Sequence, residues 1–129
     1  MSYQLQSDRA AVEALLVLPA DEIDGARWEP VPGCPGVIEK TLWQFGAFTQ
    51  ALVHYDTGAS SPGRPHLAAH HHIWVVSGTG EIAGRTLAAG SYLHVPPQVW
   101  HPIKGVGPDG CTVLQMHRPH APREADRLH

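Results

Sequence analysis

Short runs of apolar and β-branched residues, separated by turn residues, fill the chain from Val37 to Met116. Apolar and polar positions alternate within several of these runs, which is typical of strands with one buried face. The predicted strands are residues 37–43, 48–55, 73–77, 80–82, 91–95, 100–103 and 111–116. Turn signals such as Asp56-Thr-Gly58, recurring about every ten residues, favour an antiparallel sandwich or barrel over alternating strands and helices.

The segments outside this region have a different pattern. Ser7 is a candidate cap for a short helix that reaches Leu16, and Pro19 is expected to end it. We expect residues 21–36 to be irregular, with Trp28 as an anchor on the barrel. The sequence thus divides into an N-terminal helix and arm (1–36), a barrel (37–116) and a tail (117–129). The tail is charged and aperiodic, so its histidines are expected to be solvated.

Composition narrows the class of protein. The 129 residues suffice for one domain, and a formal charge of −3 with scattered Lys and Arg gives no case for binding nucleic acid or an anionic membrane. Cys34 and Cys111 do not suggest a disulfide framework. Without a signal-peptide pattern or a membrane-length apolar run, we expect a reduced, cytoplasmic protein. The unusual count is histidine, with ten residues.

Four of the ten histidines lie close together, at His66 and at His70, His71 and His72. Imidazole is a common ligand of borderline transition metals, so this cluster indicates a metal site. Strand alternation sends His71 to one face and its two neighbours to the other. For His66 to share the interior with His71, the intervening residues 67–69 must bulge or turn.

At these histidines the chain resembles the cupin superfamily, over roughly residues 37 to 116. The first cupin motif is glycine, five residues, His-x-His, three or four residues, glutamate, six residues and glycine. Counting back from Gly78 places His71 at the position of the glutamate and His66 at the second histidine. Arg64 stands where the first histidine would be.

The second cupin motif is glycine, five residues, Pro-x-Gly, two residues and histidine. Gly90, Pro96 and His101 match it position by position. Gln98 replaces the central glycine. This match makes His101 the best-supported residue of the candidate site.

The resemblance implies an all-β, antiparallel jelly-roll barrel with a three-histidine metal shell of His66, His71 and His101. A three-residue spacer in the first motif would make His70 the ligand in place of His71, and the distance to Gly78 favours His71. The alternative to a three-histidine metal shell is a barrel without metal, in which the histidines bond one another or water.

Three neutral imidazoles leave a divalent ion its full charge and open coordination positions. Similar shells occur in cupin dioxygenases, so the resemblance favours a non-haem Fe(II) oxygenase acting on a small organic molecule. The alternatives are an isomerase, cyclase or lyase with zinc, nickel or manganese, and a cupin that binds a small ligand without catalysis. Arg64, Tyr55 and Gln115 are candidate substrate-binding residues, with Arg64 suited to an oxyanion.

Single-domain cupins commonly pair through a sheet, which implies a homodimer. The apolar outward positions Trp74 and Val76 offer the surface for such pairing.

Overall fold

The computed structural model describes residues 16–61, 69–99 and 101–119. The chain there forms one short helix and eight strands. In chain order these are α2 (Ala20–Gly25), β1 (Glu29–Pro30), β2 (Val37–Phe45), β3 (Phe48–Tyr55), β4 (Ala69–Ile82), β5 (Arg85–Ala88), β6 (Tyr92–Val95), β7 (Ile103–Lys104) and β8 (Cys111–Pro119). No helix in these residues is long and apolar enough to cross a membrane.

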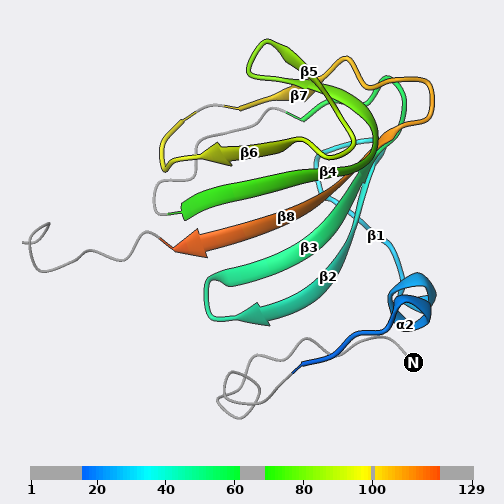
Figure 1. Cartoon of the computed structure of the whole chain (residues 1–129), viewed down its shortest axis with the longest axis vertical. Helices are drawn as coiled ribbons and strands as arrows, with labels where there is room; N and C mark the ends of the chain where they lie inside the picture. The colour runs from blue at the N-terminus through cyan, green and yellow to red at the C-terminus, as the bar shows by residue number, and fades with distance from the viewer. Residues whose placement is uncertain (1–15, 62–68, 100, 120–129) are drawn as a thin grey trace, which may run out of the picture.

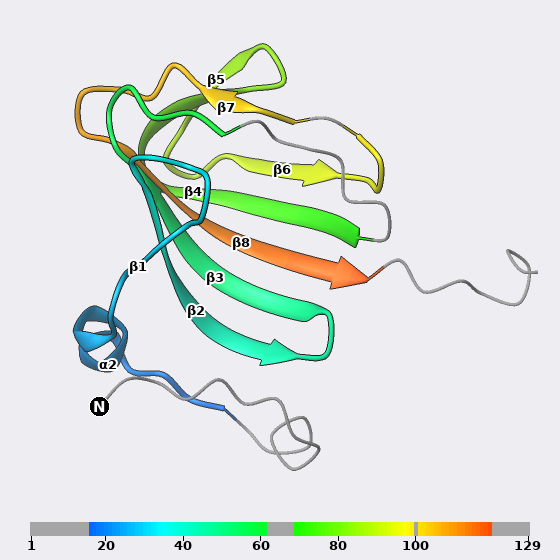
Figure 2. The same ribbon diagram turned by 180° about the vertical axis from the view of Figure 1, so that it is seen from behind.

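All strand pairs are antiparallel, in the order β1-β2-β3-β8-β4-β5. Strands β6 and β7 pair with different parts of β4. Figures 1 and 2 show β2, β3, β8, β4 and β6 side by side in a curved sheet, with β5 and β7 above one end of it. This arrangement confirms the predicted all-β, antiparallel cupin barrel.

Strand β4 is longer than expected, because the two predicted strands 73–77 and 80–82 are one strand of 14 residues. The register with β8 shifts between Val75 and Ser77, and Gly78 follows with φ of +75°. Gly78 was expected to lie in a turn, but its positive φ instead accommodates a bulge that bends β4 without ending it. Strand β4 therefore joins the large sheet to β5 and β7.

The N-terminal segment contains a helix where an irregular arm was expected. Pro19 is the N-cap residue of α2, whose first turn carries Asp21 and Glu22. Acidic side chains in the first turn of a helix are stabilised by the positive end of the helix dipole. At the other end, the buried Lys40 ammonium of β2 donates to the carbonyl oxygens of Ile23 (2.8 Å) and Asp24 (3.2 Å). The predicted helix from Ser7 lies outside the described residues, apart from Leu16.

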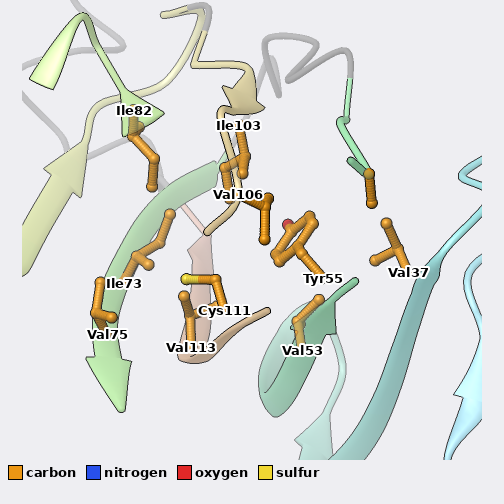
Figure 3. Packing of buried hydrophobic residues seen from close by; sticks show 11 residues of the cluster. Val37, Val53, Tyr55, Ile73, Val75, Ile82, Ile103, Val106, Cys111 and Val113 are labelled. Carbon is orange, nitrogen blue, oxygen red and sulfur yellow. The ribbon is translucent and has the colours of Figure 1, made fainter. Parts of the chain in front are cut away.

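The hydrophobic core lies on the inner face of the sheets, where alternate residues of neighbouring strands meet. Val53, Val113 and Val75 are in register across β3, β8 and β4, and none is more than 5% exposed. Figure 3 shows these side chains in one cluster with Tyr55, Ile73, Ile82, Ile103 and Val106. Cys111 belongs to this core, and both Cys34 and Cys111 are free thiols. Packing of small β-branched side chains thus fills one end of the barrel.

The substitution of Gln98 for the second motif's central glycine has a visible consequence. Residues 96–99 form a turn in which the Val99 amide donates to the Pro96 carbonyl at 3.4 Å, and Gln98 has φ of +66°. With Pro97 at its second position, this turn has the pattern of a type II turn, whose third position favours glycine. A side chain there costs about 1–2 kcal/mol of backbone strain.

Gln98→Gly is therefore expected to stabilise the protein. The relief of strain is partly offset by the greater backbone entropy of glycine in the unfolded chain, which leaves a net gain of about 0.5–1 kcal/mol. Urea unfolding monitored by circular dichroism would measure it. Gln98→Ala is the control, because alanine keeps the strain; a glycine variant no more stable than the alanine variant would contradict the account.

Candidate functional site

A cavity of about 510 Å³ opens inside the barrel, between β2, β3, β4, β8 and the loop of residues 31–34. One part of its wall is apolar and includes Val37, Val53 and Ile73. The polar side chains that line it are Glu39, Tyr55, Ser61, His71, His101, Gln115 and His117. An apolar wall with a few convergent polar groups is the usual form of a small-molecule site.

Two of these polar groups, His71 and His101, are buried and contact each other. Their exposed fractions are 3% and 8%, and His71 Nδ1 lies 2.9 Å from His101 Nε2. His101 Nδ1 is 3.2 Å from the Val99 carbonyl oxygen, which can only accept a hydrogen bond. In neutral His101 the proton is therefore on Nδ1, and Nε2 presents a lone pair toward His71. This is how backbone carbonyls orient metal-ligating histidines.

His117 forms the third imidazole of the cavity, in register with His71 on the neighbouring strand β8. The ring centroids of His71 and His117 are 3.9 Å apart. His117 Nε2 is 3.1 Å from the Gln115 amide nitrogen, and His117 Nδ1 is 3.1 Å from Thr49 Oγ1. The amide donates to Nε2, so the Nδ1 proton is donated to Thr49. The expectation of a solvated His117 was wrong, because β8 continues to Pro119 rather than ending at Met116.

Glu39 is a second cavity residue that sequence reasoning missed. It lies on β2 opposite Val53 and lines both the main cavity and an adjoining one of about 290 Å³. Burial of its carboxyl group raises its pKa. A carboxyl group whose pKa is raised by burial in a cleft is a candidate for proton transfer.

Tyr55 and Gln115, both predicted to bind substrate, line the cavity. Burial raises the pKa of the Tyr55 phenol to about 12, and a hydrogen bond with the Ser61 side chain only partly offsets this. Tyr55 therefore stays protonated and can donate a hydrogen bond. Gln115 is held by His117, which fixes its amide at the junction of the two cavities.

The structure places His70 and His71 on opposite faces of β4. His71 lies in the cavity, whereas His70 is on the outer face, with its Nδ1 at 2.9 Å from His94 Nε2. His66 and Arg64 lie outside the described residues. Within the described part, no group of three His, Cys, Asp or Glu side chains is arranged to hold a metal ion. The set of His66, His71 and His101 therefore stays a prediction.

The outer face of β4 and β6 carries its own group of imidazoles, His70, His72 and His94. The ring centroids of His72 and His94 are 4.7 Å apart, and His72 Nδ1 lies 2.6 Å from the Tyr92 hydroxyl. The register of Tyr92 with Trp74 places Tyr92 on this outer face. Burial lowers the pKa of His72, and the nearby His94 and Arg118 lower it further.

A fold of antiparallel strands around a cavity that holds histidines from both motifs makes this protein a cupin. Residues 20–121 match the ChrR cupin-like domain family, and the chain belongs to that family. No curated protein sequence matches the chain.

Solved structures give the same fold. KdgF from Halomonas sp. is similar at 25% identity and a TM-score of 0.62, over 81% of this chain and 95% of that one. An RmlC-like cupin from Shewanella frigidimarina is 24% identical (TM-score 0.61; 79% and 89% covered). The polyketide cyclase RemF from Streptomyces resistomycificus is 20% identical (TM-score 0.63; 76% of each chain). The last two likenesses concern the fold alone.

Proposed function

We propose that this protein is a metal-dependent cupin enzyme acting on a small organic molecule, with a divalent ion held by His66, His71 and His101. The observation that carries the proposal is the buried contact between His71 and His101. Each comes from a different motif, and both line one cavity.

The donor chemistry fits such an ion. Imidazole nitrogens suit Fe, Zn, Ni and related ions, whereas carboxylate-rich sites suit Mg and Ca. The Val99 carbonyl fixes the His101 tautomer with Nε2 toward His71. The two histidine nitrogens share a hydrogen bond at 2.9 Å. An ion held by both would take the place of the shared proton, and the rings would have to turn so that both nitrogens face it.

A bound ion would supply Lewis acidity toward a substrate oxygen or, if it is iron, a place for dioxygen beside the substrate. The protein's own residues supply the rest. The apolar wall excludes water from the body of the ligand, the Tyr55 hydroxyl and Gln115 amide orient its polar end, and Glu39 accepts or returns a proton. Arg64 is the further candidate for pairing a substrate oxyanion.

Two reaction types are compatible with these parts. Three neutral histidine ligands favour an Fe(II) dioxygenase, as the sequence suggests. The Glu39 carboxyl group favours a proton transfer without oxidation, as in an isomerase, cyclase or lyase. Purified protein loaded in turn with Fe(II), Zn, Ni or Mn would be assayed with diketone, thiol and phenolic substrates, with and without O2. Oxygen uptake only with iron supports the oxygenase, anaerobic turnover supports the second type, and saturable binding without turnover rejects catalysis.

Glu39→Gln is expected to lower turnover about 100-fold or more, because an amide cannot accept the proton. It should not destabilise the fold. Since the carboxyl pKa is raised on folding, its ionisation above that pKa opposes folding, so stability falls as pH rises through it. The neutral amide removes this loss at pH 7. Turnover and thermal unfolding between pH 4 and 8 would be measured together; unchanged turnover would reject the role of Glu39.

We also propose a homodimer that pairs through the outer face of β4. Trp74 and Val76 are 39% and 52% exposed there, and the Trp74 ring packs against Tyr92 of β6 at 4.8 Å between centroids. Sedimentation equilibrium should give the mass of two chains for the wild type and of one chain for Val76→Glu, which places a charge in the interface. A wild-type monomer would reject the dimer.

A further inference from the structure

Three imidazoles meet on the outer face of the barrel, away from the cavity. His70 and His72 are alternate residues of β4, and His94 is paired in register with His72 on β6. Ring centroids are 5.1 Å apart for His70 and His94 and 4.7 Å for His72 and His94, with interplanar angles of 14° and 13°. A strand places alternate side chains on one side, so this proximity is built into the sheet.

One pair of these imidazoles shares a hydrogen bond. His70 Nδ1 and His94 Nε2 are 2.9 Å apart. At metal–nitrogen distances of 2.0–2.1 Å, two ligand nitrogens are about 2.9 Å apart at a right angle and about 3.4 Å apart in a tetrahedron. A metal ion bound by both nitrogens would replace the shared proton. Both rings would have to turn, because in the hydrogen bond each nitrogen points at the other and not at a common third point.

His72 is placed to become the third ligand. Its Nδ1 contacts the Tyr92 hydroxyl at 2.6 Å, and its Nε2 is buried without a hydrogen-bond partner in the described part of the chain. If Nδ1 donates to Tyr92, Nε2 carries a lone pair, which is the form a metal requires. The three rings are nearly parallel and do not converge in this conformation, so ligation by His72 requires its ring to rotate.

We propose that His70, His94 and His72, which do not converge on one point in this conformation, turn to form a second, external binding site for a borderline divalent transition metal such as Zn²⁺, Ni²⁺ or Cu²⁺. All its donors are imidazoles, which excludes Ca²⁺ and Mg²⁺ as preferred ions. One neighbour opposes binding. Arg118 is in register with His70 on β8, and its positive charge repels an incoming cation.

The test uses the full chain, stripped of metal, in equilibrium dialysis against Zn²⁺ with the bound metal measured by mass spectrometry. His94→Gln is expected to lose one equivalent, or to bind it at least tenfold more weakly. Arg118→Gln should tighten it, by on the order of fivefold at low salt.

A second set of variants distinguishes Zn²⁺ binding in the cavity from Zn²⁺ binding at the external site. His101→Gln should still bind one equivalent of Zn²⁺ at the external site, whereas His94→Gln should still bind one equivalent in the cavity. If the cavity proposal is wrong, His101→Gln will bind as much Zn²⁺ as the wild type. The result for His94→Gln at the external site does not depend on that outcome. Histidine side-chain NMR shifts in the His101→Gln background identify the external ligands directly. If His94→Gln and Arg118→Gln both bind Zn²⁺ as the wild type does, the external site is rejected.

Discussion

Gly78→Ala is expected to destabilise the protein by about 3 kcal/mol or more. A β-carbon at this position would collide with the Gly110 carbonyl oxygen and lie 2.8 Å from its carbon. Both atoms belong to the backbone of a paired segment, since the Thr79 amide donates to the Gly110 carbonyl. The backbone must shift or the pairing of β4 with β8 must open, and φ of +75° adds strain for alanine.

Gly84→Ala is the matched control for this prediction. Gly84 has the same φ of +75°, but nothing lies within 4 Å of the place that a β-carbon would take there. This variant carries the backbone strain without the collision and should cost about 1 kcal/mol. Chemical unfolding of both variants gives the comparison. Equal losses of stability would show that close packing of Gly78 on Gly110 is unimportant.

The second large effect concerns the cavity metal. His101→Gln is expected to remove one equivalent of bound metal from the purified protein. Loss of a partner that only orients a ligand typically costs 10- to 100-fold in affinity, and loss of the ligand itself costs more. The glutamine fills a similar volume, so the fold should remain intact, which circular dichroism would verify. Turnover should fall together with the metal content.

His54→Gln is the control for His101→Gln. His54 contacts Thr112 Oγ1 at 2.7 Å and Trp28, and it does not line the cavity. Metal content should match the wild type in this variant. Full metal content in His101→Gln would overturn the assignment at the residue that the sequence supports most strongly.

Much of the fold could be predicted, because period-two alternation and turn residues are local signals. The same alternation is enough to separate His71 from its two neighbours. It failed at Gly78, where glycine in a bulge looks the same as glycine in a turn. It also failed at the end of β8. Pro119 and the charged residues after it are typical of a tail, yet residues 117–119 belong to the strand.

The missed cavity residues show the limit of local reasoning. In the segment Val37–Thr41, Glu39 and Lys40 are adjacent polar residues, and either could face solvent. The choice depends on α2, whose carbonyl groups bind Lys40 on the outside and leave Glu39 on the inside. His117 depends similarly on the register of β8 with β4. Such contacts join residues far apart in the sequence, so no local pattern reveals them.

The run of three histidines in β4 also affects how mutations in this strand would be tolerated. A one-residue slip of a strand turns every side chain to the opposite face, which usually destroys a site. Here a slip in either direction would bring His70 or His72 to the position of His71, so an imidazole would still point into the cavity. A slip confined to the residues before Ile73 would therefore keep an imidazole in the inner site, whereas a slip of the whole strand would also turn Ile73 and Val75 out of the core. The outer group would lose a member, which makes it the more fragile of the two during evolution.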